Sequence, residues 1–251
     1  MNRIVKSLSA FLGIGILSIG LAAQTSSAGR YDSDIQGRVS QQLATKREFR
    51  NLEATTEDGI VTLTGSVDLY QQKLDAAKKI RKAEKVQGVR NLIEVGSNVP
   101  DAELATKLDR KLYFDRIGYD NQFNFVTVSV EDGVATLSGE TRTEVGRDSA
   151  LAIANRMPGV KEVVNDIKVS PVSGFDDDIR VLAMRAIYND PVLGRYATDP
   201  AAPIRILVSN GKLSLYGTVE NAMDKQMAGI RANQVFGVFR VENNLVVANK
   251  T

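Results

Sequence analysis

The chain has 251 residues, of which 43% are hydrophobic and 25% are charged, a composition typical of globular proteins with room for two or three small domains. It contains no Cys and no His, which excludes disulfides, a thiol nucleophile, and the commonest general base and metal ligand. The formal net charge of +2 comes from Arg3 and Lys6, and the balanced charge of the remainder argues against a nucleic-acid-binding protein.

The first 28 residues have the layout of a secretory signal peptide. Arg3 and Lys6 precede an apolar run from Leu8 to Ala23, and small residues up to Ala28 fit a cleavage site. An uncleaved membrane anchor is the alternative, but the run is shorter than the roughly 20 apolar residues that span a bilayer. We therefore expect cleavage after Ala28, a periplasmic mature protein, and no transmembrane span in that mature chain.

A short motif then occurs three times, at Asp58–Val67, Asp132–Thr141 and Asn210–Val219. Each copy starts with Asp-Gly or Asn-Gly between β-rich runs, which predicts a type I′ hairpin turn with positive φ at both central residues. Apolar residues then alternate with polar ones, as in a strand with one buried face. A second Gly follows six positions after the first, where the backbone must bend or be approached closely.

An amphipathic helix with an acidic start precedes each hairpin. The predicted helices begin near Asp34, near Asp101, and after the run Asp176-Asp177-Asp178. That last run could suggest a bound cation, but no further ligand spacing follows it, and we interpret it as a helix N-cap.

A second helix and a third strand complete each copy. Small residues such as Ala76, Ala150 and Ala228 dominate the inner face of this helix, so that it can lie close to the sheet. Gly159 and Gly237 end it in copies two and three, whereas copy one has Lys85 at that position. The third strand has an Asn at the same place in every copy, where it could satisfy a backbone group at a bend; these are Asn91, Asn165 and Asn243. The glycines expected at structural turns are Gly59, Gly65, Gly133, Gly139, Gly159, Gly211, Gly217 and Gly237.

The predicted fold class is α+β, with three tandem αββαβ domains. Each domain is expected to hold a three-stranded mixed sheet with two helices on one face. The predicted domain limits are 31–97, 100–170 and 175–249.

These motifs resemble the BON domain (bacterial OsmY and nodulation). The resemblance is most complete in copy two, which has Asp132-Gly133, Pro158-Gly159-Val160, Asn165 and Ile167. Copy one departs from it at Lys85, and copy three departs at Asn210 and at Leu245-Val246-Val247. The resemblance implies an exported, often periplasmic protein associated with phospholipid membranes or envelope proteins, sometimes under osmotic or envelope stress. It implies no common catalytic residue set.

Basic residues crowd the second helix of copy one. They could hold anionic lipid headgroups, or they could simply form a solvated face opposite the apolar stripe. The candidate lipid-binding residues of this helix are Lys73, Lys78, Lys79, Arg81 and Lys82.

A second candidate set lies after the first helix of copy two. Tyr113, Phe114 and Tyr119 surround Arg116, and such aromatics could enter a headgroup layer. The alternative is that the aromatic residues of this segment are buried where the helix ends and the strand begins.

No nucleophile–base pair, phosphate-binding loop or metal-ligand set is recognisable, so we expect a non-enzymatic protein without cofactors. Two hypotheses remain: association with anionic phospholipid surfaces, or a periplasmic protein-interaction or chaperone-like module in which linked weak sites gain avidity.

Overall fold

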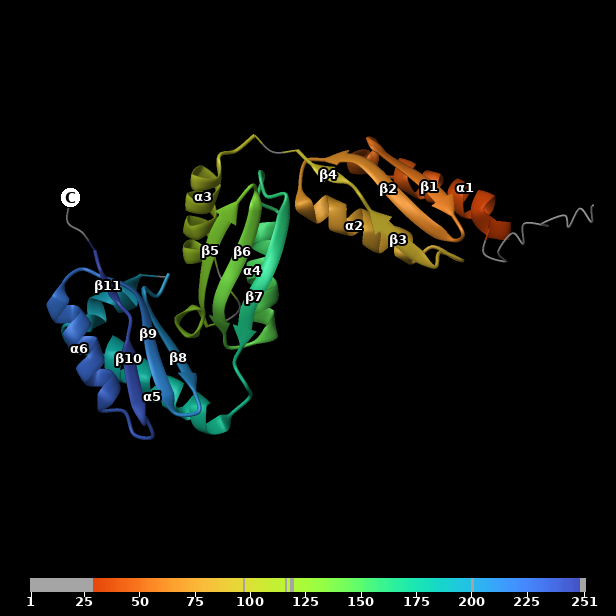
Figure 1. Ribbon diagram of the computed structural model, residues 1–251. Coiled ribbons are helices and arrows are strands. Elements are labelled where there is room, and N and C mark those ends of the chain that lie inside the picture. Colours follow the sequence, from red (N-terminus) through yellow and green to blue (C-terminus); the bar gives the residue numbers. More distant parts are fainter. Residues whose placement is uncertain (1–28, 97, 116, 118–119, 200, 249–251) are drawn as a thin grey trace, which may run out of the picture.

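The computed structural model describes residues 29–96, 98–115, 117, 120–199 and 201–248, so the predicted signal peptide lies outside the described residues. The chain forms three αββαβ units that follow one another along an elongated molecule (Figure 1). The prediction of an α+β fold made of three similar units is confirmed.

The three units have the same order of elements, except that the third strand is continuous in the second unit and divided in two in the others. The first unit contains α1 (Asp32–Ala44), β1 (Leu52–Glu57), β2 (Ile60–Val67), α2 (Tyr70–Arg81), β3 (Gly88–Asn91) and β4 (Glu94–Val95). The second contains α3 (Asp101–Phe114), β5 (Phe125–Glu131), β6 (Val134–Thr141), α4 (Glu144–Asn155) and β7 (Glu162–Val169). The third contains α5 (Gly174–Tyr188), β8 (Ile204–Ser209), β9 (Lys212–Val219), α6 (Ala222–Asn233), β10 (Arg240–Asn243) and β11 (Val246–Val247).

Each sheet is mixed, with the second strand of the hairpin at its centre. In the second unit β6 pairs antiparallel with β5 and parallel with β7, and the other two units repeat this arrangement. The alternating residues Val61 and Leu63 of β2 are fully buried, in one cluster with Val39 of α1 and Ile80 of α2. Both helices therefore cover the same face of the sheet, as predicted.

The hairpin turns have the predicted positive φ angles, for example 53° at Asp132 and 81° at Gly133. Each turn is held from outside by a carboxylate at the start of the first helix. The oxygens of Asp101 accept hydrogen bonds from the backbone N–H groups of Asp132, at 2.7 Å, and Gly133, at 2.9 Å. Asp32 binds the turn of the first unit in the same way.

The N-cap interpretation of the run Asp176-Asp177-Asp178 is wrong. The helix begins earlier, at Gly174, and the hydroxyl of Ser173 accepts the capping bond from the N–H of Asp176. The carboxylate of Asp176 instead accepts hydrogen bonds from the backbone N–H groups of Asn210 and Gly211. It therefore holds the hairpin turn of its unit, as Asp32 and Asp101 do in theirs. The first helix of the first unit also begins earlier than predicted, at Asp32 rather than near Asp34.

The Asn of the third strand bridges a bend, as its position suggested. In the first unit Asn91 accepts from the N–H of Ile93 at 3.3 Å and donates to the carbonyl of Lys73 at 3.0 Å. This bend divides the third strand into β3 and β4, and it turns Ile93 into the core. Asn243 makes the same pair of contacts in the third unit, with Leu245 and Lys225.

Lys85 takes the backbone conformation that Gly159 and Gly237 take in the other units. Its φ is +68°, a left-handed value that a residue with a side chain adopts at some cost. The ammonium group of Lys85 lies 3.7 Å from the centre of the Tyr31 ring, a cation–π contact that offsets part of this cost.

Candidate functional site

The basic residues of the first unit line a groove between the end of α1 and α2. The groove has a volume of about 580 Å³ and is lined by Gln42, Lys46, Asp75, Lys78, Lys79 and Lys82. The lining thus holds four positively charged lysines and one negatively charged aspartate. The spacing of α2 explains the arrangement, because its apolar stripe of Ala76 and Ile80 is buried and turns the lysines outward.

The four lysines of this groove are not equivalent. Lys79 donates to the carbonyl of Gln42 and to the hydroxyl of Thr45, both at 2.9 Å, so it stabilises the C-terminal end of α1. Lys46 forms an ion pair with Glu48 at 3.0 Å. Lys78 and Lys82 are exposed, lie one helical turn apart, and form no ion pair among the described residues. These two side chains are the ones available to an anionic ligand.

The other two basic candidates of this helix lie outside the groove lining. Lys73 is half-buried, and its carbonyl accepts the bond from Asn91. Arg81 is exposed in the last turn of α2, where a cation is favoured by the helix dipole. Arg81 therefore has a structural reason to be basic that requires no ligand, whereas the contact at Lys73 involves only its backbone.

Two aromatic candidates of the second unit, Tyr113 and Phe114, make an edge-to-face contact with ring centroids 4.9 Å apart, but they differ in their surroundings. Phe114 is exposed beside Lys107, Arg110 and Lys111 of α3, on a groove of about 440 Å³. Tyr113 is half-buried against the third unit, where its ring lies 5.8 Å from the guanidinium of Arg205. Burial raises the pKa of Tyr113, so its hydroxyl stays neutral in the physiological range. Arg116 and Tyr119 lie outside the described residues.

An extensive joint between the second and third units was missed by sequence reasoning. η3 (Asn121–Phe123) of the second unit packs on β8, and Phe123 is buried in the core of the third unit rather than its own. Phe125 stacks on Tyr216 of β9, with ring centroids 4.5 Å apart. The buried guanidinium of Arg205 donates to the carbonyls of Asn121 and Tyr113.

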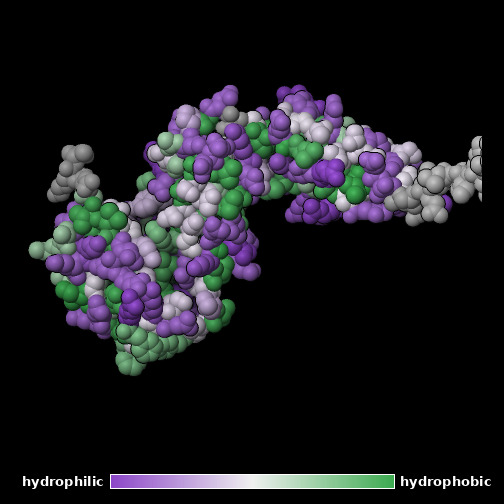
Figure 2. Space-filling view, in the orientation of Figure 1, coloured by the Kyte–Doolittle hydropathy of each residue, from purple (hydrophilic) through white to green (hydrophobic). Residues whose placement is uncertain are grey.

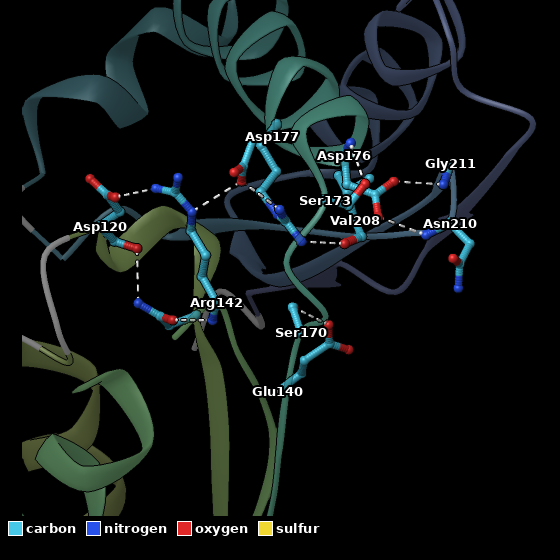
Figure 3. Close-up of polar contacts among 12 residues, drawn as sticks. Asp120, Glu140, Arg142, Ser170, Ser173, Asp176, Asp177, Val208, Asn210 and Gly211 are labelled. Carbon is cyan, nitrogen blue, oxygen red and sulfur yellow. Dashed lines mark hydrogen bonds and ion pairs between the residues drawn. The ribbon is translucent and has the colours of Figure 1, made fainter. Parts of the chain in front are cut away.

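A charged network closes one side of this joint (Figure 3). Arg142, at the end of β6, bridges Asp120 at 2.6 Å and Asp177 of α5 at 3.2 Å. Asp177 also accepts from the buried Arg180 at 2.7 Å. Partial burial alone would raise the pKa of Asp177, but the hydrogen bonds from Arg180 and Arg142 outweigh it and lower that pKa. In the sequence, Arg142 is a single basic residue in a turn between a strand and a helix, and such a residue gives no signal of a bridge between units.

The pocket beside this joint offers little reactive chemistry. It has a volume of about 250 Å³ and its lining includes Gln122, Tyr188, Tyr196 and Asp199. The hydroxyl of Tyr188 donates to the carbonyl of Ile204, and burial raises the pKa of this phenol. The hydroxyl of Tyr196 is bound to the carboxylate of Asp224 at 2.6 Å. Within the described ranges, no group of three His, Cys, Asp or Glu side chains could hold a metal ion.

Comparison with known protein families places this architecture. The model of the BON domain matches three segments of the chain, at residues 31–97, 100–171 and 186–249. The chain belongs to the BON domain family. The third match begins inside α5, and we keep 175–249 as the proposed third BON domain because Ile179 and Ala183 of that helix lie in its core.

Relatives of this BON protein include the osmotically-inducible protein Y of Escherichia coli strain K12. The two are 30% identical over 147 residues, which cover 55% of this chain and 72% of the relative. Two structures of CdsD, a structural protein of the type III secretion system of Chlamydia trachomatis, align at 18% identity. The alignment with one of them covers 86% of this chain and 96% of the CdsD chain, with a TM-score of 0.24. A similarity this low supports no conclusion about this chain. No helix among the residues described in this BON protein is long and apolar enough to cross a membrane.

Proposed function

We propose that this chain is an exported, non-enzymatic envelope protein that associates with anionic phospholipid surfaces. The observation that carries the proposal is the groove of the first BON domain, where Lys78 and Lys82 project without ion-pair partners among the described residues. An ammonium group near an anionic membrane surface contributes about 1 kcal/mol of binding free energy. The E. coli relative is osmotically inducible by name, and we extend a role under osmotic stress to this chain as part of the proposal.

Co-flotation with vesicles tests the lipid contact. We expect the protein to float with vesicles of phosphatidylglycerol and phosphatidylethanolamine at low salt, and binding should weaken as salt screens the charges. Lys78→Glu with Lys82→Glu should weaken binding at least tenfold, since two favourable charges become repulsive. Lys161→Glu with Lys168→Glu is the matched control, because it changes the net charge equally at exposed positions of the second domain.

The two variants distinguish binding through the lysine groove from binding that depends only on the net charge of the protein. An equal loss of binding in both would show that net charge matters and the groove does not. Absence of co-flotation by the unmodified protein would refute the lipid proposal and leave the protein-interaction hypothesis.

Export is a separate part of the proposal, and protein chemistry tests it. The mature protein should be recovered from the periplasmic fraction with Gly29 as its first residue. A chain recovered with residues 1–28 attached would contradict cleavage.

A further inference from the structure

One tip of the third unit exposes three phenylalanines. Phe175 lies in the first turn of α5, and Phe236 and Phe239 lie in the loop between α6 and β10. Their exposed fractions are 48%, 87% and 80%. Figure 2 shows this apolar area at the lower end of the molecule, over the loop that follows α6. We call these three residues the phenylalanine tip.

The tip is built on a well-supported part of the fold. The ring of Phe239 lies so close to Gly211 that a Cβ on that glycine would stand 2.5 Å from it, and the Phe175 and Phe239 ring centroids are 6.3 Å apart. The hairpin turn beneath Phe239 is held by Asp176, which accepts from the N–H groups of Asn210 and Gly211. The rings of Phe175 and Phe239 are therefore supported from behind, while the exposed ring of Phe236 projects beside them.

The BON fold does not require these phenylalanines. The residues that precede the turn-binding Asp are Tyr31, Pro100 and Phe175 in the three units. Aligned on the left-handed residues Lys85, Gly159 and Gly237, the other two positions hold Glu84 and Gln87 in the first unit. In the second unit they hold Pro158 and Lys161. Two copies of the same fold thus form without an apolar tip, so its exposure needs a reason outside the folding of the unit.

The charges around the tip complement an anionic lipid surface. Lys212 of β9 and Arg240 of β10 adjoin the loop and share one carboxylate, that of Glu242, at 2.7 and 3.2 Å. The nearest exposed carboxylate of α5, that of Asp178, belongs to the residue three positions after Phe175. Aromatic side chains flanked by cations suit the boundary between headgroups and acyl chains. A bilayer also accepts a projecting side chain such as Phe236 without needing a matching hollow.

We infer that the phenylalanine tip inserts into the interfacial layer of a phospholipid bilayer, with Lys212 and Arg240 at the phosphates. The inference rests on the proposed membrane association and adds an apolar contact, in a different BON domain, to the electrostatic contact of the basic groove. Binding through the tip should persist in part at salt concentrations that abolish binding through the lysines.

The absence of Trp from the chain gives a direct test. Phe239→Trp creates a single tryptophan at the tip, and Met223→Trp creates one at the other end of α6, about 15 Å along the helix from the end that leads to the tip. Each variant is mixed with vesicles of equal parts phosphatidylglycerol and phosphatidylethanolamine, with or without brominated acyl chains. We expect a blue shift and bromine quenching for the tip variant and neither for the Met223 variant.

A second variant measures how much the tip contributes. Phe236→Ser with Phe239→Ser removes exposed side chains and should leave the fold intact, as checked by circular dichroism, while vesicle binding falls at least tenfold. Vesicle-bound protein with an unshifted tryptophan and unchanged affinity of the serine variant would overturn the inference while leaving the proposed function standing. Failure of every form to bind vesicles would overturn both proposals.

Discussion

Gly139 shows how a single residue determines the approach of two strands. Its φ is +120°, and a Cβ there would lie 2.2 Å from the carbonyl oxygen of Phe125. Gly139→Ala should therefore destabilise the second unit by more than about 2 kcal/mol, since both the backbone conformation and the space oppose a side chain. Hydrogen exchange of β5 and β6, together with urea unfolding, measures the loss.

Gly37 is the control for that substitution. It lies in α1, and a Cβ added there would have nothing within 4 Å. Gly37→Ala should stabilise the first unit by about 0.5–1 kcal/mol, because alanine loses less conformational freedom in a helix. Equal losses in the two variants would mean that space at Gly139 is not the limiting factor.

At the residue scale, the sequence revealed positions more reliably than partners. The spacing of the repeated glycines predicted both hairpin turns and close approaches, because backbone conformation is a local property. Acidic helix starts were expected near Asp34, at Asp101 and at Asp176-Asp177-Asp178, but the carboxylates of Asp32, Asp101 and Asp176 were not expected to bind the hairpin turns. A carboxylate can bind the N–H groups of its own helix or of a turn 26 or more residues away, and local sequence does not distinguish these partners.

At the scale of elements, Phe123 belongs by sequence to the second unit and by packing to the third. Phe123→Ala should cost the third unit about 3–5 kcal/mol, because the substitution leaves a cavity in that core. Hydrogen exchange should then accelerate in β8 and β9 more than in β5 and β6. Faster exchange confined to β5 and β6 would contradict the assignment.

Phe114→Ala provides the control for that measurement. Phe114 is 62% exposed, so its truncation should change stability by no more than about 0.5 kcal/mol. Comparison of the two variants tests whether the loss of stability depends on the burial of the side chain or on the removal of any aromatic ring.

Helices and strands were predictable because apolar periodicity repeated three times in register. The joint between units was not predictable. A short 3-10 helix lies at the same place in every unit, as η2 (Arg47–Phe49), η3 and η4 (Leu193–Thr198), but Phe49 enters its own core whereas Phe123 enters the core of the next unit. That contact depends on residues far apart in the chain. Sequence reasoning placed the lysines of α2 on one helix correctly, but it could not show that Lys79 is bound to α1 while Lys78 and Lys82 project.

At the scale of the whole molecule, Asp177 makes the joint between the second and third units dependent on pH. Its pKa is lowered in the folded protein, since the hydrogen bonds from Arg180 and Arg142 outweigh the opposing effect of burial. The stabilisation that this carboxylate provides is therefore present above its ordinary pKa, about 3.9, and is lost as pH falls through the lowered value. The joint should loosen only below about pH 4.

Fluorescence transfer measures this loosening, because the chain has no cysteine to interfere with labelling. Dyes on Ser129→Cys and Gln226→Cys, both exposed positions, report the distance between the two units. The distance distribution should broaden at acid pH, and Asp177→Asn should broaden it already at neutral pH. A distribution in Asp177→Asn that matches the parent at pH 7 would exclude a role for this carboxylate in the joint.

The connection between the first two units has a different character. Tyr70 packs against the cores of both units, and no ion pair among the described residues crosses from one to the other. α2 also meets α4 at this connection. We expect a contact without ion pairs to act as a pivot, whereas the arginine-rich joint acts as a brace. If the phenylalanines anchor one end of the molecule, the lysine groove at the other end can still tilt to meet a curved bilayer. Membrane curvature would then decide whether one end or both are engaged.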